Sequence, residues 1–368
     1  MSRRPTRRLG VPRRKQGEPK VSVVAVTGIA GYLAQRLLSS LEADDQIQRI
    51  IGIDRVAPPL GSPKLEYHEM DIREARLPKV IADADAVVHL AFQTDTLRDI
   101  KEMRAINVDG TANVLAAAAA VGARSVVVLS SALVYGAHTD NPVPLTEDAP
   151  LRANEDFAPA VHKLLCERLV ELYRSEHPDM AVCVFRAATV FGPTVDNFVT
   201  RMLEAPRLTR VKGFDPPLQV VHEDDVAAAL VFAATTRLDG IYNLAADGWL
   251  SGDEVAEISG KRRVELSEQV AFSMADRLWR AGLTAAPAGE LHYVMHPWVL
   301  DIGRLAAAGF RPRYTNRAAL LEAAEAHRTW IALGRARVRK DSLAKGAAAT
   351  LGAIGAMALV RRARRREE

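Results

Sequence analysis

The chain has 368 residues, 48% of them hydrophobic, which is enough to bury a large core in one α/β domain or two smaller ones. The net charge of +4 is uneven, because residues 1–20 and 335–368 each carry +7 and leave −10 on residues 21–334. Two cysteines occur, Cys166 and Cys183, in a predicted helix and a predicted strand, which excludes a disulfide framework and disfavours a metal site; a reducing cytosol is the simpler interpretation.

The two basic tails are expected to be solvated segments. Residues 1–20 contain Arg pairs without the apolar run of a secretory signal. The C-terminal tail holds an uncharged apolar run, Gly346–Val360, which is shorter than the roughly 20 residues of a spanning helix. It is either a membrane-associated helix beside an anionic lipid surface or a helix for soluble packing or oligomerisation. Nothing in the body indicates nucleic-acid readout, so a lipid surface is expected as the anionic partner of the tails ahead of nucleic acid. We expect a cytoplasmic protein, with contact to the inner face of the membrane left open.

A glycine-rich loop follows the first predicted strand, residues 23–27. Gly28 permits a sharp turn, Gly31 lets the backbone approach a pyrophosphate, and Ala34 lets the next helix pack closely on the strand. The N–H groups and dipole of the helix start favour an anion. The pattern therefore predicts a dinucleotide-binding turn, whose candidate contacts are Thr27, Gly28, Ile29, Ala30, Gly31, Tyr32 and Leu33.

The second predicted strand, residues 50–53, leads into Asp54, 26 residues after Gly28. A carboxylate there can accept hydrogen bonds from both ribose hydroxyls and repels a 2′-phosphate, which favours NAD over NADP. Arg55 weakens this preference, because an arginine can accommodate that phosphate. An ordinary βα turn in another doubly wound fold is the alternative interpretation.

The rest of the first half alternates buried strands with helices. Apolar runs at 84–91 and 125–129 predict buried strands on either side of a long Ala-rich helix over 99–121. This alternation predicts a doubly wound parallel sheet of about seven strands, with a ligand beyond the carboxyl ends of its strands.

The second half is less regular and predicts a smaller mixed α/β lobe. We place the main domain at residues 21–185 and the lobe, interleaved with it, at 186–334. Helices are expected at 164–173, 224–234, 251–282 and 316–333, and strands at 182–186 and 240–244.

Taken together, the motifs resemble the extended short-chain dehydrogenase/reductases, the NAD-dependent epimerase/dehydratase family, over about residues 21–325. The landmarks follow the family order: Thr27-Gly28-x-x-Gly31-x-x-Ala34, Asp71-Ile72, His89-Leu90-Ala91, Asn107-Val108-x-Gly110-Thr111-x-Asn113, Ser130-Ser131-x-x-Val134-Tyr135-Gly136, Arg186-x-x-x-Val190-Phe191-Gly192-Pro193, Val221-His222-x-Asp224-Asp225-Val226, Tyr242-Asn243-Leu244-Ala245 and Asp301-x-x-Arg304. The resemblance implies a Rossmann-type fold that binds NAD, and it weakly implies a homodimer. It also implies cofactor contacts at Asp71, Ile72, Leu90, Ala91, Asn107 and Lys163.

The catalytic part of the resemblance is incomplete. In the family, a Tyr transfers the substrate proton, a Lys four residues later lowers the pKa of that Tyr, and a Ser hydrogen-bonds the substrate oxygen. Ser131 and Lys163 match the Ser and Lys roles, but the Tyr position holds Pro159, which has no ionisable group. Tyr135 and His162 are weak substitutes. We expect Tyr135 to form a pocket wall, and His162, about 100° from Lys163 around the helix, to be a surface or capping residue.

The resemblance implies an oxidoreductase-type enzyme that acts on a small molecule, either a nucleotide-sugar or a lipid-like alcohol or ketone. The alternative is a catalytically silent NAD(H)-binding module with a regulatory or scaffolding role.

Other residues in the second half have a structural and a binding interpretation. Arg201, Arg207 and Arg210 suit contact with a diphosphate, although each is expected to be a surface charge, and Arg186 is expected to brace the fold. An aromatic cluster either packs under the lobe or lines the substrate pocket; its members are His292, Tyr293, His296 and Trp298.

Overall fold

The computed structural model describes residues 21–197, 200–201, 204–205, 207–284, 287–333 and 336–339. The N-terminal tail and the apolar run Gly346–Val360 lie outside these residues. Of the predicted C-terminal tail, residues 336–339 are described. They form a strand, β13 (Ala336–Arg339), that pairs antiparallel with β12 (Trp330–Leu333). Among the described helices, none has the length and hydropathy that crossing a bilayer requires.

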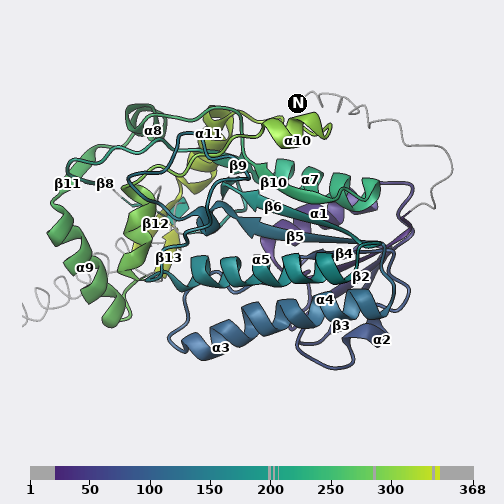
Figure 1. The fold of residues 1–368 in the computed structure, drawn as a ribbon. Coiled ribbons are helices and arrows are strands. Elements are labelled where there is room, and N and C mark those ends of the chain that lie inside the picture. The colour runs from purple at the N-terminus through teal and green to yellow at the C-terminus, as the bar shows by residue number, and fades with distance from the viewer. Residues whose placement is uncertain are drawn as a thin grey trace, which may run out of the picture.

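One parallel sheet of seven strands forms the centre of the molecule, in the order β10-β6-β5-β4-β1-β2-β3 (Figure 1). The strands are β1 (Val23–Thr27), β2 (Arg49–Asp54), β3 (Leu65–Glu69), β4 (Ala86–His89), β5 (Ser125–Ser131), β6 (Ala181–Ala187) and β10 (Gly240–Leu244). The predicted doubly wound sheet is confirmed. The strand order reverses between β1 and β4, so a ligand crevice is expected beyond the carboxyl ends of these two strands.

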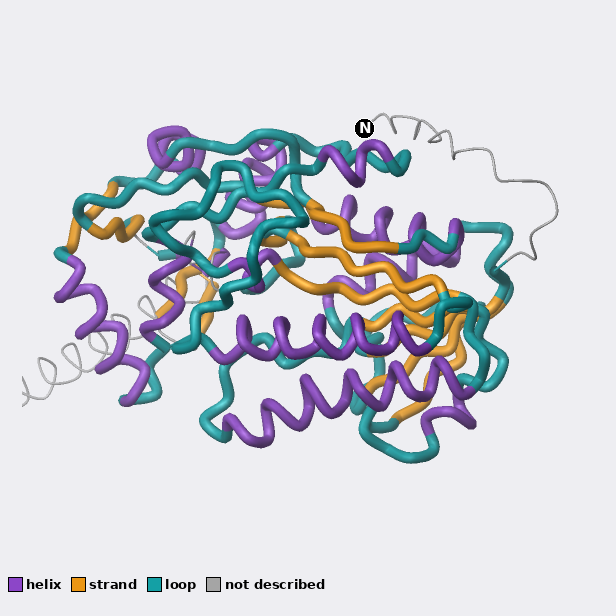
Figure 2. The backbone as a smooth tube through the Cα atoms, in the orientation of Figure 1, coloured by secondary structure: helices purple, strands orange, loops and turns teal. Residues whose placement is uncertain are grey.

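Helices cover both faces of this sheet (Figure 2). On one face, α1 (Tyr32–Glu42) packs beside α7 (Glu223–Thr236), and their apolar side chains share a core with Val24 and Val26. On the other face, α2 (Leu77–Val80), α4 (Gly110–Ala120) and α5 (Ala158–Glu176) enclose a second core with Ala25. Alternate residues of a strand point to opposite faces, which is why β1 contributes to both cores.

The helix expected over 99–121 is interrupted. It begins as α3 (Ile100–Arg104), passes through a π-helical turn, η1 (Ala105–Asp109), and continues as α4. A π turn adds one residue without breaking the helical pattern, so apolar spacing in an Ala-rich run does not reveal it. This turn contains Asn107, one of the predicted cofactor contacts.

The second half of the chain forms a lobe but also completes the main sheet, because β10 and α7 come from it. The lobe contains the parallel pairs β7 (Thr189–Phe191) with β9 (Val220–His222) and β8 (Leu208–Val211) with β11 (Arg263–Leu266). Its other elements are α8 (Gly252–Ser259), α9 (Glu268–Arg280), η3 (Ala288–Val294), α10 (Gly303–Ala307) and α11 (Asn316–His327). The segments 251–282 and 316–333 are mainly helical, as expected, although β11 divides the first and the second ends in β12.

Buried carboxylates at the start of α7 join the lobe to the main domain. Glu223 accepts hydrogen bonds from Arg36 of α1, at 2.8 Å, and from the backbone and hydroxyl of Thr194. Asp225 accepts the backbone N–H groups of Arg313 and Tyr314, each at 2.9 Å. Because these carboxylates are buried, each needs such donors to offset its desolvation.

A second buried ion pair joins α5 to the sheet. The Arg186 guanidinium on β6 donates to Glu167 Oε2 from Nη2 at 2.8 Å and from Nε at 2.9 Å. Arg186 also donates to the Tyr135 hydroxyl and to the Glu147 carbonyl, each at 2.9 Å. Both charged side chains are almost completely buried, so the expectation that Arg186 braces the fold is confirmed.

Replacing Arg186 with Met should destabilise the chain strongly, because the Glu167 carboxylate would then be buried without its partner. We expect the free energy of unfolding to fall by about 3–5 kcal/mol, measured by chemical denaturation. The matched control is Arg174→Met, which breaks an exposed pair with Asp239 and should cost about 0–1 kcal/mol. Equal small losses in the two variants would show that the buried pair does not brace α5.

Candidate functional site

The glycine-rich loop has the geometry that its sequence predicts. Gly28 has a φ of +75°, and its N–H donates to the Ile53 carbonyl at 2.8 Å. A Cβ at Gly28 would lie 2.7 Å from the backbone nitrogen of Ala91, so no larger residue fits there. The Gly31 N–H donates to the Gly28 carbonyl at 3.0 Å, which closes the turn directly before α1.

The start of α1 is available to an anion. Gly31 is the N-cap residue, no side chain caps the helix, and its first turn contains no acidic residue. The first N–H groups of a helix have no partner within the helix, and the dipole places partial positive charge there. These features of the described loop fit the pyrophosphate of a dinucleotide.

Asp54 ends β2 beside this loop. Its Oδ2 accepts the Ala30 N–H at 3.0 Å, and its Oδ1 accepts the Arg55 N–H at 2.7 Å. A carboxylate offers about four acceptor positions, so Asp54 can hold the loop and still accept ribose hydroxyls. The structure confirms that Asp54 lies at the loop, and its contact with ribose stays a prediction.

His89, at the end of β4, links three elements of the site. Its Nδ1 lies 2.7 Å from the Thr27 hydroxyl, and its Nε2 lies 2.9 Å from the Thr111 hydroxyl. Thr111 donates its proton to the Asn107 carbonyl at 2.6 Å, so His89 Nε2 donates to Thr111 and Nδ1 accepts from Thr27. Burial lowers the pKa of His89 to about 3, so the ring is neutral. Sequence reasoning named His89 only as part of a motif and did not predict that it links Thr27 to Thr111. The available signal was that all three residues belong to motifs at the same end of the predicted sheet.

Asn107 fixes the loop that follows β4. Its Oδ1 accepts the Gln93 N–H at 2.7 Å, and its Nδ2 donates to the Gln93 carbonyl at 3.0 Å. The same amide lies 3.3 Å from His162 Nδ1. His162 is only 3% exposed, so the expectation of a surface or capping residue was wrong. It contacts the π turn because α5 packs against η1.

Two backbone turns carry the other predicted cofactor contacts. The N–H groups of Leu90 and Ala91 donate to the carbonyl and hydroxyl of Thr27. The Ile72 carbonyl accepts a hydrogen bond from Asn113 of α4 at 2.5 Å, and the Asp71 carboxylate binds the Arg73 guanidinium, which lowers the pKa of Asp71. A contact of Asp71 with adenine stays a prediction.

Lys163 points to the carboxyl end of β5. Its Nζ donates to the Leu129 carbonyl at 2.7 Å and lies 3.7 Å from the centre of the Phe92 ring. Desolvation lowers the pKa of Lys163 to about 8, so the ammonium form still predominates at pH 7. Ser131 ends the same strand, and its Oγ accepts the Leu133 N–H at 3.3 Å. The structure therefore brings both predicted catalytic residues to one strand end.

No phenol lies at the position of the family Tyr. Pro159 is buried in the first turn of α5, where its missing N–H costs nothing, one helical turn before Lys163. Tyr135 cannot substitute, because its side chain is 0% exposed and its hydroxyl donates to Asn243 Oδ1 at 2.7 Å while it accepts from Arg186. Burial raises the pKa of Tyr135 to about 12. Its assignment as a pocket wall was wrong, because it belongs to the buried network around Glu167.

A cavity of about 470 Å³, here called the chamber, lies between the loop after β4, α9 and η3. Among the described residues of its wall, three are charged: Asp95, Arg201 and Glu290. Arg201 lies in the chamber wall and forms an ion pair with Asp196 at 2.7 Å. The expectation that Arg201 is a surface charge was therefore wrong. Sequence reasoning missed Glu290, whose position in a short irregular segment gives no pattern.

The aromatic cluster packs within the lobe as expected, and its role as a wall of the substrate pocket stays a prediction. The Tyr293 ring contacts Phe157 and Trp298, with centroids 5.6 and 5.0 Å apart. Tyr293 and Trp298 also line a smaller cavity of about 140 Å³ together with Arg210. His292 lies 3.1 Å from Asp156, and His292 and His296 stack at 6.4 Å.

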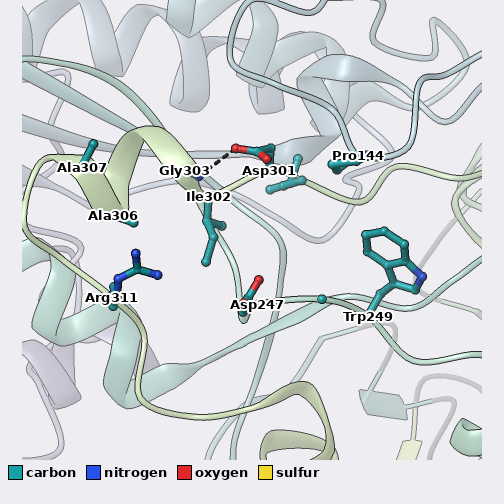
Figure 3. Close-up of a pocket in the computed structure, with 11 residues that line it drawn as sticks. Pro144, Asp247, Trp249, Asp301, Ile302, Gly303, Ala306, Ala307 and Arg311 are labelled. Carbon is teal, nitrogen blue, oxygen red and sulfur yellow. Dashed lines mark hydrogen bonds between the residues drawn. The ribbon is translucent and has the colours of Figure 1, made fainter.

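A further cavity of about 410 Å³ lies away from these groups (Figure 3). Its wall includes Asp247, Trp249, Asp301 and Arg311, and Asp301 Oδ1 accepts the Gly303 N–H at 2.8 Å. None of the predicted cofactor or catalytic residues lines it, and it shares no lining residue with the chamber.

Sequence comparison identifies relatives. The family model described as NAD dependent epimerase/dehydratase family matches residues 24–245. Uncharacterized protein Rv0501 of Mycobacterium tuberculosis is 30% identical over 305 residues, which cover 80% of this chain and 81% of that protein. A dTDP-glucose 4,6-dehydratase of Streptomyces griseus is 26% identical over 251 residues, or 62% of this chain and 75% of that enzyme. The resemblance inferred from the motifs is confirmed, and NAD is the cofactor for which the matched family is named.

Solved structures share the fold. MoeE5 in complex with UDP-glucuronic acid and NAD superposes with a TM-score of 0.67 at 23% identity, over 83% of this chain and 99% of MoeE5. The UDP-glucose 4-epimerase of Thermus thermophilus in complex with NAD gives 0.65 at 20% identity, over 83% of this chain and 99% of the epimerase. At these identities the likeness establishes the Rossmann-type fold.

Replacing Gly28 with Ala should destabilise the loop, because the new Cβ meets the backbone of Ala91 and the residue keeps a positive φ. The control is Gly122→Ala, where φ is +69° and nothing lies within 4 Å of the Cβ. The control should lose about 1–2 kcal/mol of unfolding free energy from strain alone, and Gly28→Ala should lose more. Thermal or denaturant unfolding measures both, and equal losses would contradict the close approach.

The buried neutral His89 should make stability fall in acid. Below pH 6.5 the unfolded His89 takes up a proton, whereas the folded ring stays neutral until about pH 3. The free energy of unfolding should therefore decrease by up to about 1.4 kcal/mol per pH unit as the pH falls from 6 to 4. His89→Asn should reduce this slope by that amount in denaturant titrations, and an unchanged slope would show that His89 is not neutral in the folded chain.

Proposed function

Because the chain belongs to the NAD dependent epimerase/dehydratase family, we propose that it binds NAD(H) and exchanges hydride with a small alcohol or ketone, either a nucleotide-sugar or a lipid-like compound. One observation carries this proposal. The glycine loop, the uncapped start of α1, Asp54 and Lys163 all lie at the carboxyl ends of neighbouring strands of one parallel sheet. When bound, the nicotinamide ring supplies the hydride donor or acceptor.

Each part of the crevice has a role in holding the cofactor. The loop from Gly28 to Leu33 would bind the pyrophosphate, and Asp54 the adenosine ribose. The Asp71-Ile72 turn would hold the adenine, and the segment from Leu90, fixed by Asn107, would line the phosphates and ribose. Lys163 would hold the nicotinamide ribose. Asp54 also favours NAD(H) over the 2′-phosphorylated form.

The chain's own residues orient the substrate but leave its proton unassigned. Ser131 would hydrogen-bond the substrate oxygen, and the Lys163 ammonium would provide positive charge beside it. Pro159 has no proton to give or take, and Tyr135 is enclosed in the buried network. A water molecule or another side chain would therefore carry the proton.

The catalytically silent NAD(H)-binding module is the second candidate. Pro159 favours it, and so does the arrangement of Lys163, whose ammonium is hydrogen-bonded to Leu129 and covered by Phe92. This module would respond to the cofactor's binding or redox state without turning over a substrate.

Location and assembly belong to the proposal as well. We place the chain in the cytoplasm, with its basic tails in contact with an anionic membrane surface and with a homodimer as a possible assembly. Fractionation of cells with and without residues 335–368 tests the membrane contact, which unchanged soluble behaviour of both forms would contradict.

Pro159→Tyr tests whether the chain is an enzyme that lacks only the phenol hydroxyl for proton transfer. We expect the variant to oxidise NADH with a ketone substrate about 10²-fold faster than Pro159→Phe, a control of similar size without the hydroxyl. NADH oxidation is followed by absorbance with methyl heptyl ketone and with a UDP-4-ketosugar.

NADH binding by the same variants provides the control readout. Background turnover in all of them, despite intact NADH binding, would support the silent module and contradict the catalytic proposal.

A further inference from the structure

The chamber has the size and lining of a small-molecule site. Its volume of about 470 Å³ lies within the range of ligand pockets. Its wall is mainly apolar, with side chains from β8, β11, α9 and η3: Val211, Leu266, Met274, Leu278, Leu291 and Val294. Figure 1 shows α9 at one end of the molecule, next to β8 and β11.

Two segments of the chamber wall lead along the chain to the proposed hydride-transfer site. Its wall includes Thr94, two residues after the Phe92 ring that covers Lys163. It also includes Phe157, the N-cap residue of α5, six residues before Lys163. η3 packs directly on this cap, since a Cβ at Gly289 would lie 2.6 Å from the Asp156 carbonyl oxygen.

The charges in the described wall do not suit a diphosphate. Two carboxyl side chains, Asp95 and Glu290, face one arginine, Arg201. The Arg201 guanidinium already pairs with Asp196 at 2.7 Å and lies 3.9 Å from Asp95. A diphosphate would therefore find no uncommitted guanidinium among the described lining residues and would lie beside the Asp95 carboxylate.

The neighbouring smaller cavity has a different set of charges, because its described lining holds two arginines, Arg210 and Arg263, and one carboxylate, Asp215. Its Arg210 lies 3.5 Å from Asp215 and 3.6 Å from Glu265. Its Arg263 pairs with Asp253 at 2.8 Å. Each of these arginines faces a carboxylate, but Arg263 Nη2 is buried without a hydrogen-bond partner among the described residues. The exclusion of a diphosphate therefore applies to the chamber and not to this smaller cavity.

Glu290 places one hydrogen-bonding group in the apolar wall. Among the described residues its carboxyl makes no hydrogen bond, and the charges that act on it are those of Asp95 and Arg201. Burial and the nearby Asp95 raise the pKa of Glu290 well above its usual range, which favours the protonated form. A protonated carboxyl can donate to a carbonyl oxygen and accept from a hydroxyl.

We propose that the chamber binds an uncharged, mainly apolar alcohol or ketone whose oxygen meets the Glu290 carboxyl. This inference rests on the proposed function for its connection to hydride transfer, and it selects the lipid-like substrate class over nucleotide-sugars. The apolar wall supplies the affinity, and Glu290 orients the oxygen.

Binding of an uncharged dye to the full chain, without cofactor, tests the chamber. Nile red fluorescence reports occupancy, and methyl heptyl ketone should displace the dye whereas UDP-glucose should not. Ala275→Phe places a ring in the chamber and should weaken Nile red binding about tenfold or more, because it overfills the occupied space. Ser273→Phe adds the same ring at an exposed position of α9 outside the chamber and should change the affinity by less than about twofold.

A second comparison tests Glu290 itself. Glu290→Leu should lower the preference for methyl heptyl ketone over the alkane of equal length by about three- to tenfold, since one hydrogen bond is lost. Glu290→Gln keeps a donor at similar volume and should retain the preference. An unchanged ratio in Glu290→Leu would overturn the role of Glu290.

The outcomes separate this inference from the proposed function. One outcome would overturn the apolar assignment and leave the proposed function intact. In it, the chain binds NADH, UDP-glucose displaces Nile red, and Ala275→Phe abolishes that displacement. Displacement of Nile red by the ketone without any NADH binding would support the chamber and contradict the proposed function. Equal Nile red affinity in both α9 variants would show that the chamber is not the binding site.

Discussion

The buried ion pair between Arg186 and Glu167 is the constraint on which the arrangement of the site depends. It fixes α5 against β5 and β6, and α5 carries both Lys163 and Pro159. Burying two charges is unfavourable unless their remaining hydrogen-bonding groups are satisfied, and here Ser130, Tyr135 and the Glu147 carbonyl satisfy them. Tyr135 is therefore a structural member of this network, and the proton of a substrate has to be carried by another group.

The candidate site has a cofactor-binding part, whose expected residues are all in place, and a proposed proton-transfer part, in which one expected residue is missing. On the cofactor side, each feature supports the next: Gly28 approaches Ala91, Asp54 holds the loop at Ala30, and neutral His89 joins β1 and β4 to α4. On the proposed proton-transfer side, Lys163 lies at the carboxyl end of β5, and Pro159 occupies the position where the resemblance implies a Tyr. The apolar chamber beyond the start of α5 holds the Glu290 carboxyl in its wall, and on this we base the proposal of an uncharged, lipid-like substrate.

Local patterns predicted much of this structure from sequence, because the strands, the glycine turn and the position of Asp54 depend on neighbouring residues. The features that sequence could not predict depend on distant contacts. The Tyr135 hydroxyl meets Asn243, 108 residues away, and His162 is buried only because α5 packs on the π turn around Asn107. That π turn shifts the helical register by one residue, but the shift cannot be seen in an Ala-rich run, and Glu290 lies in a short segment without periodicity. Burial and hydrogen bonding of these residues are properties of the assembled fold.

The most direct test of the cofactor site is calorimetric titration of the full chain with NADH and NADPH, which measures the two affinities. The same titrations are made with an Asp54→Asn variant. The geometry predicts that NADH binds at least about tenfold more tightly than NADPH, because the Asp54 carboxylate accepts ribose hydroxyls and repels a 2′-phosphate. Asp54→Asn should reduce this difference. Failure of both nucleotides to bind, or a preference for NADPH that Asp54→Asn leaves unchanged, would contradict the assignment of the glycine loop and Asp54 as an NAD(H) site.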